Sequence, residues 1–421
     1  MSQEDWVRLQ YYSRKVKFFS GIMKDDLQVH PTTYNRIAQL LKSTSLFPSL
    51  RRFRYDLDLD VTHIFLFLSP LLDSLELFNF MGSENIIVGP FLAAISPQML
   101  SRIVLCSGRM SGDILKKYIG HFKQLRSLEL SYAIDMSDFT LWEVLGTLPS
   151  LANLTFSLNP ELHPTPDPEN SDSQCGGPKY FEALESLCVT GSLSLTQHLL
   201  GFIDSPCLKS IEVYLVPVFH NETTADPDSD DLFTTSMTIV DSKWSQSLKN
   251  LVIDSSFSGY YGISKCIMLF MVLHEMQTCH LTEWHIGNLQ VDNDVRRLVM
   301  SWPKLRVLNL EQTLISLSTL MIIAENCPEL RQLHIHLDTS TFPPFDTSSK
   351  SLRHNLEVLN VAEDPSSGSF TQSTLESQIQ VSLHLDLNFP YLKAIVVQPE
   401  DVTWSAIRDL VKLCQVVRRV K

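Results

Sequence analysis

The sequence predicts an α/β solenoid, in which short parallel strands alternate with helices along the chain. The segment from Val291 to Asp338 contains the same unit twice: an amphipathic helix, a short stop containing proline, and a strand of pattern LxxLxL. The two strands begin at Leu305 and Leu330, which are 25 residues apart. A unit of this size cannot bury its own apolar face, so it has to stack on copies of itself. The pattern is that of a leucine-rich repeat.

The same strand pattern recurs along nearly the whole chain. Most intervals between its leading apolar residues are close to the 20 to 29 residues typical of leucine-rich repeats. We therefore expect a horseshoe-shaped leucine-rich-repeat solenoid, with parallel strands on its concave face and helices on its convex face. The predicted leading positions are Leu50, Leu72, Leu100, Leu125, Leu151, Leu184, Leu208, Leu248, Leu281, Leu305, Leu330, Leu356 and Leu392.

Three parts of the chain are expected to differ in role. Residues 1–45 form an N-terminal capping segment with the first helix and strand, and 46–398 form the repeat array. Residues 399–421 form a C-terminal capping helix, in which apolar residues recur at helical spacing. Stretches rich in Pro, Ser, Thr, Asp or Gly interrupt the array at 157–179, 216–235, 339–350 and 364–373. These insertions are either solvated loops or loops that contact a partner.

Composition restricts the function. The formal net charge of −13 argues against nucleic-acid binding, which relies on phosphate neutralisation by basic residues. The start of the chain lacks the apolar core of a signal peptide, and the apolar run from Cys266 to Leu273 is too short to span a bilayer. The eight cysteines are scattered and show no disulfide or zinc spacing. We expect a cytoplasmic or nuclear protein that is monomeric and does not bind membranes.

Catalytic motifs are lacking. The sequence contains no P-loop, no glycine-rich dinucleotide turn and no GxSxG motif. His274 and Glu275 open a segment similar to a zinc-protease helix, but Thr278 stands where the second histidine ligand would be. We therefore expect a non-enzymatic protein without cofactor or metal.

Candidate binding residues lie at the outward positions of the strands. In LxxLxL the leucines point into the core, so the fifth and seventh positions point outward and form rows across neighbouring strands. A partner protein on the concave face is expected to contact a polar cluster on three strands together with two exposed aromatic residues. The alternatives for the polar cluster are a solvated strip or a metal site, although a wide sheet does not by itself enclose a tetrahedral ion. The candidates are His285, Asn309, Glu311, His334, His336, Phe78 and Tyr214.

Both ends of the chain resemble a known family. Near the N-terminus the resemblance is carried by Trp6, Arg8, Tyr12, Val16 and Lys17. Near the C-terminus it is carried by Leu385–Ile395, Trp404 and Leu410–Arg418. These segments are similar to those of fungal (basidiomycete-type) F-box proteins with leucine-rich repeats.

The resemblance implies the substrate-recognition repeat domain of a Skp1–cullin–F-box ubiquitin ligase. No F-box sequence precedes Trp6 in this chain. A Skp1-type adaptor is therefore an expected partner only if an F-box lies upstream. The alternative is a leucine-rich-repeat scaffold with no link to a ubiquitin ligase.

Overall fold

A computed structural model describes most of the chain. The described residues are 2–21, 31–41, 45–57, 61–79, 85–106, 112–131, 140–157, 180–216, 229–255, 270–282, 291–338, 345, 351–362, 374–398 and 402–420. The chain divides into two compact units, Met1–Leu208 (unit 1) and Lys209–Lys421 (unit 2).

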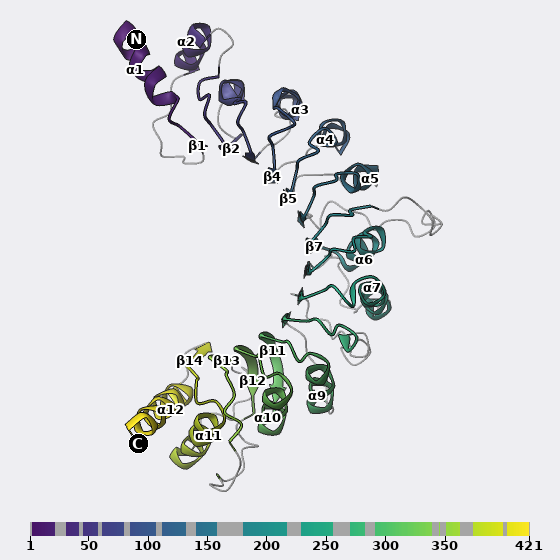
Figure 1. Cartoon of the computed structure of the whole chain (residues 1–421), viewed down its shortest axis with the longest axis vertical. Helices are drawn as coiled ribbons and strands as arrows, with labels where there is room; N and C mark the ends of the chain where they lie inside the picture. Colours follow the sequence, from purple (N-terminus) through teal and green to yellow (C-terminus); the bar gives the residue numbers. More distant parts are fainter. Residues whose placement is uncertain are drawn as a thin grey trace, which may run out of the picture. The chain divides into compact units, whose positions relative to one another are not determined.

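In unit 1 the described strands are parallel and follow one another in chain order across a sheet. They are β1 (Phe18–Gly21), β2 (Arg52–Asp56), β3 (Ser74–Phe78), β4 (Arg102–Cys106), β5 (Ser127–Ser131), β6 (Asn153–Ser157) and β7 (Ser186–Gly191). The helices α3, α4 and α5 lie along one side of these strands (Figure 1). The helical segments are α1 (Gln3–Ser13), α2 (Pro31–Leu41), η1 (Val61–Phe67, a 3-10 helix), α3 (Asn85–Ala94), α4 (Gly112–Ile119), α5 (Thr140–Gly146) and α6 (Leu193–Phe202).

Unit 2 repeats this arrangement. Its described strands are β8 (Ser210–Leu215), β9 (Asn250–Ser255), β10 (Thr278–Thr282), β11 (Val307–Ile315), β12 (Gln332–Leu337), β13 (Val358–Ala362) and β14 (Ala394–Gln398), again parallel and in chain order. The helices α9 to α12 lie on one side of the last strands (Figure 1). The helices are α7 (Ser229–Trp244), α9 (Val291–Ser301), α10 (Leu317–Asn326), α11 (Leu375–Asn388) and α12 (Val402–Val420).

The LxxLxL residues form the core of both units. Leu305, Leu308 and Leu310 expose 2% or less of their surface. The same holds for Leu330, Leu333 and Ile335 in the next repeat. In-register pairing from strand to strand stacks these residues on their counterparts in the next repeat. The predicted α/β leucine-rich-repeat solenoid is confirmed.

The repeat around β10 has a different register from the predicted one. Its leading residue is the fully buried Met276 rather than Leu281, and Cys279 and Leu281 are the inward residues that follow. The sequence LTEWHI (281–286) matches the pattern LxxLxL better than MQTCHL (276–281) does. The buried strand instead uses methionine and cysteine, both of which pack as apolar side chains. The correction moves His280 into the outward row that was predicted to contain His285.

One predicted insertion is partly helical. The stretch 216–235 was expected to be a loop, but α7 begins at Ser229, and its Phe233 and Met237 are buried. The insertion is therefore at least seven residues shorter than predicted. Residues 158–179, 217–228, 339–344, 346–350 and 364–373 lie outside the described residues.

Helices stand at both predicted capping segments. Trp6 and Leu9 of α1 pack against a small cluster that includes Ile37 and Leu41 of α2. At the other end, α12 packs on α11 and β14. No helix in the described part of the chain is long and apolar enough to cross a membrane.

His354 should make the stability of unit 2 depend on pH. Its ring is buried, with Nε2 2.8 Å from the carbonyl oxygen of Cys327, and Nδ1 accepts the backbone N–H of Leu356 at 3.1 Å. This pattern requires a neutral ring that donates from Nε2 and accepts at Nδ1. Burial lowers the pKa of His354 below its usual value of 6.5, against the raising effect of the bond to Cys327.

Because the folded pKa is lowered, the unfolded chain binds more protons below pH 6.5, and stability falls as the pH drops through that range. Urea unfolding of wild type and His354→Gln at about pH 7.5 and pH 5.5 should show a smaller acid-induced loss in the variant. Equal losses in the two proteins would contradict this assignment.

Candidate functional site: the open sheet face of unit 2

The sheet of unit 2 has one face turned away from its helices, which we call the open face. Strand residues at the third, fifth and seventh positions of each repeat lie on it, because alternate side chains point to opposite sides of a strand. Pairing between successive strands aligns the fifth positions in one row. This row consists of Glu212, Val252, His280, Asn309, His334, Asn360 and Val396.

Four successive members of this row alternate between histidine and asparagine: His280, Asn309, His334 and Asn360, called the His–Asn row below. The Oδ1 atoms of Asn309 and Asn360 are buried and have no hydrogen-bond partner among the described residues. A buried acceptor without a donor costs about 1–3 kcal/mol. Two such atoms in one row leave hydrogen-bonding capacity unmet within the described part of the chain.

His280 is held in its neutral form at neutral pH. Burial lowers its pKa below the usual value, and the neighbouring His334 adds to this, whereas Glu212 acts in the opposite direction. A neutral imidazole offers one donor and one acceptor. His280 therefore presents a hydrogen-bonding ring without a positive charge at pH 7.

The face around the row contains carboxylates but no lysine or arginine at its described outward positions. Glu212 and Asp254 lie on β8 and β9, and the Tyr214 hydroxyl donates to Oε2 of Glu212 at 3.4 Å. Arg306, Arg331 and Lys393 lie one position before the outward ones and pair with carboxylates: Arg306 with Glu329 at 3.1 Å, and the other two with Glu357. The open face of unit 2 is therefore suited to donor-rich or cationic groups.

The structure brings together part of the cluster predicted from the sequence. His285 lies outside the described residues, and His280 takes its predicted place opposite Asn309. A register shift in β11 pairs His336 with Leu314, so Glu311 does not stand beside His336 as predicted. Asn309 and Glu311 lie on β11 and His334 and His336 on the adjacent β12, and of these Asn309 and His334 stand opposite each other.

The two predicted aromatic residues belong to different units. Tyr214 lies on the open face of unit 2, two positions after Glu212. Phe78 lies on β3 of unit 1, with the Arg54 guanidinium 4.8 Å from the centre of its ring. Asn360 was missing from the predicted set, although its fifth position in the Leu356 repeat is readable from the sequence. His280 could not be found in this way, because the register of its repeat is ambiguous.

The described residues offer little for metal or thiol chemistry. They contain no group of three or more His, Cys, Asp or Glu side chains placed to hold a metal ion. Burial raises the pKa of Cys279 and of Cys327 to about 12, so both are protonated thiols at neutral pH.

Comparison with known proteins finds distant structural matches. No family model and no curated protein matches the chain. The crystal structure of the Rad7 and Elc1 complex in yeast contains a chain with 14% identity and a TM-score of 0.44, over 94% of this chain and 90% of that one. A Bacteroides fragilis protein has 14% identity and a TM-score of 0.33, over 74% of each chain. The leucine-rich repeat-containing protein LegL7 from Legionella pneumophila has 11% identity and a TM-score of 0.34, over 81% of this chain and 91% of that one. At these values the resemblance concerns the path of the chain alone.

Proposed function

We propose that this chain is a non-enzymatic protein-binding repeat module, and that its His–Asn row binds an extended segment of a partner protein. The observation that carries the proposal is the pair of buried, unpartnered amide oxygens at Asn309 and Asn360. A partner that supplies N–H donors would remove the cost of both.

The spacing of the row suits an extended peptide. Adjacent strands are about 4.8 Å apart, so the four row members span roughly 14 Å. An extended chain rises about 3.3 Å per residue and would cover that distance in about four residues. Its backbone N–H groups could bond to the amide oxygens once the two asparagine side chains turn toward it, and a lysine or arginine could approach Glu212 and Asp254. Tyr214 and His336 flank the row and belong to the proposed contact surface.

The proposal predicts a preference for basic peptides. An array of blocked ten-residue peptides, each with two lysines and paired with its acetyl-lysine twin, would be probed with the full chain at pH 7.5. Acetylation removes the positive charge, and we expect it to weaken binding about tenfold, which is ~1.4 kcal/mol. Lowering the pH to 5.5 should also weaken binding to the extent that it protonates His280, whose pKa lies below its usual value, because this places a positive charge on the row. Stronger binding of the acetylated twins, or at pH 5.5, would contradict the proposal.

A more specific role is substrate recognition for an F-box-type ubiquitin ligase. This second proposal rests on the resemblance described for the segments around Trp6 and Trp404. Both tryptophans have packing roles: Trp6 joins α1 to α2, and Trp404 is a buried residue of α12. We expect the chain to bind a purified Skp1-type adaptor only when an F-box is fused upstream. Binding without the fusion would place the adaptor contact within residues 1–45, and no binding with it would count against the ligase role.

A further inference from the structure

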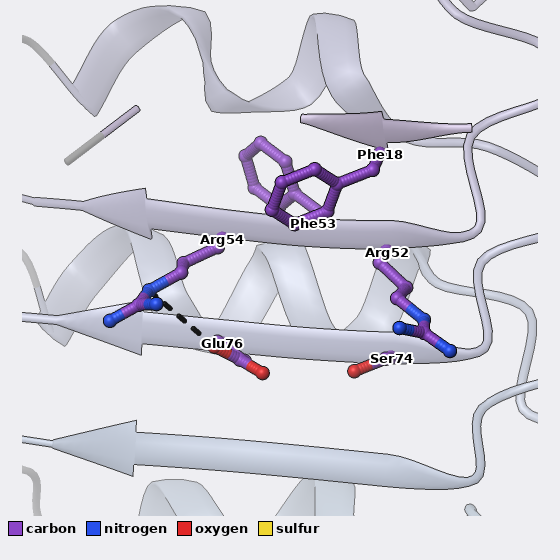
Figure 2. Close-up of a pocket in the computed structure, with 6 residues that line it drawn as sticks. All are labelled: Phe18, Arg52, Phe53, Arg54, Ser74 and Glu76. Atoms are coloured by element: carbon purple, nitrogen blue, oxygen red, sulfur yellow. Dashed lines mark ion pairs between the residues drawn. The ribbon is translucent and has the colours of Figure 1, made fainter. Parts of the chain in front are cut away.

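A small pocket lies on the open face of unit 1, where the sheet begins. It has a volume of about 130 Å³ and is lined by Phe18, Arg52, Phe53, Arg54, Ser74 and Glu76. Arg52 and Arg54 stand two residues apart on β2, so their side chains share a face. They extend toward β3, on which Ser74 and Glu76 lie (Figure 2). Phe18 pairs with Arg52 from β1 and is 58% exposed.

The charges around the pocket leave one guanidinium uncompensated. Oε2 of Glu76 lies 3.5 Å from Nε of Arg54, and Oε1 of Glu76 lies 3.8 Å from a terminal guanidinium nitrogen of Arg102. The same nitrogen of Arg102 lies 4.0 Å from Oε2 of Glu129. Arg52 forms no ion pair or side-chain hydrogen bond within the described part of the chain. Three arginines therefore face two glutamates, and the unmatched charge is that of Arg52.

The remaining carboxylate on β2 does not change this balance. Asp56 is buried, accepts a hydrogen bond from Nδ2 of Asn79 at 2.9 Å, and does not line the pocket. Ser74, which does line it, has a hydroxyl group without a hydrogen-bond partner in the described residues. Arg52 and Ser74 thus supply several donors to one space, while Phe18 supplies an apolar wall.

We propose that this pocket binds a carboxylate side chain of a partner peptide, with an apolar residue beside it packed against Phe18. A guanidinium donates two parallel hydrogen bonds to a carboxylate, a geometry that lysine cannot reproduce. Glu76 on the pocket wall opposes a second negative charge, so a monoanionic carboxylate fits better than a phosphate dianion. The volume is about that of four water molecules at roughly 30 Å³ each, which accommodates a carboxylate and its first methylene groups. This site lies in unit 1 and stands independently of the His–Asn row.

The probe for this site is 3-phenylpropionate, which combines a carboxylate with an aromatic ring. Its affinity for the full chain would be measured by ligand-detected NMR titration. The neutral 3-phenylpropanamide and the dianionic 2-phenylethylphosphonate serve as matched ligands. We expect the carboxylate to bind at least tenfold more tightly than the amide and more tightly than the phosphonate. If the amide bound equally well, the ring alone would account for binding, and the proposal of a carboxylate site would be wrong. Tighter binding of the phosphonate would show that the pocket prefers a dianion to a carboxylate.

Protein variants test whether the probe binds at Arg52. Arg52→Gln should weaken the binding of 3-phenylpropionate at least tenfold. Arg52→Lys should restore only part of the lost affinity, because lysine keeps the charge but lacks the planar guanidinium that donates two parallel hydrogen bonds. Arg126→Gln removes one positive charge from an exposed position on the same unit and should leave affinity unchanged. Arg52 is exposed, so thermal melts of these variants should match wild type. If Arg126→Gln lost as much affinity for 3-phenylpropionate as Arg52→Gln, the probe would be attracted by general positive charge, and the proposed site would be wrong.

Discussion

Removal of α12, by truncation before Val402, is expected to cause the largest loss of stability in unit 2. Trp404, Ile407 and Val411 expose 2% or less of their surface in this helix. Burial of each such side chain contributes about 1.5–3 kcal/mol, or roughly 5–9 kcal/mol for the three. That is comparable with the roughly 5–15 kcal/mol that holds a typical domain folded.

Polar contacts add to the attachment of α12. Nε2 of Gln415 donates to the Leu392 carbonyl at 2.9 Å, and Arg418 pairs with Asp386 on α11. Without the helix, the apolar side of α11 is uncovered and β14 loses its neighbour, a state that favours association. Urea unfolding and size-exclusion chromatography should show a lower midpoint and self-association. The matched control is Leu413→Ala, which alters an exposed residue of α12 and should change neither. A truncated chain with the wild-type midpoint would show that α12 is not a cap.

Trp302→Ala is expected to be one of the most damaging single substitutions in unit 2. The indole is fully buried, and its Nε1 donates to the carbonyl oxygen of Phe270 in the preceding repeat at 3.1 Å. Truncation of a buried tryptophan costs about 3–5 kcal/mol, through lost apolar contact and the cavity that remains. The Phe270 carbonyl also loses its donor in a buried place, which costs about 1–3 kcal/mol more.

Two further variants separate these contributions. Trp302→Phe retains an aromatic ring but no donor, so its loss should lie between those of wild type and Trp302→Ala. Met300→Ala changes a residue that is 62% exposed on the neighbouring turn of α9 and should stay within about 0.5 kcal/mol. Urea unfolding followed by circular dichroism gives all three values. A Trp302→Ala midpoint close to that of Met300→Ala would contradict the assigned role of the tryptophan.

Much of the fold could be predicted from the sequence because strand and helix periods are local signals. The leucines at Leu305, Leu308 and Leu310 set the inward face of a strand whatever surrounds them, and repetition confirms the register from one repeat to the next. The helix that ends just before Trp302 was equally readable, from apolar residues at helical spacing. These signals require no knowledge of contacts between distant residues.

The errors arose where two registers competed or where the chain departed from the repeat. The segment around Cys279 offers a weaker LxxLxL pattern than the one starting at Leu281, and only stacking on β9 and β11 decides between them. The register shift between Leu310 and Leu314 adds residues to β11, and no periodic pattern in the sequence predicts them. Because outward residues depend on register, these two features place His280 opposite Asn309 and pair His336 with Leu314, neither of which was predicted, while the fold prediction stood.

The pocket at Arg52 was hidden for a different reason. Arg51, Arg52 and Arg54 are visible in the sequence as a basic patch, but their pairing depends on residues that are distant in the sequence. Glu76 and Arg102 are brought beside Arg54 by the parallel pairing of three strands. Sequence reading identifies such residues as outward, and only the structure identifies which charge is left unmatched.

The most direct test of the proposed function is the affinity of a basic peptide from the array for a triple variant of the His–Asn row. Asn309→Ala, His334→Ala and Asn360→Ala remove both unpartnered amide oxygens and the imidazole between them. The matched control, Arg296→Ala, Glu325→Ala and Glu376→Ala, changes three exposed residues on the helices α9, α10 and α11 of the same unit. Fluorescence anisotropy at pH 7.5, with equal melting temperatures, should show at least a tenfold weaker complex for the row variant and wild-type affinity for the control. Wild-type affinity in the row variant would contradict the account and place the binding surface elsewhere on the chain.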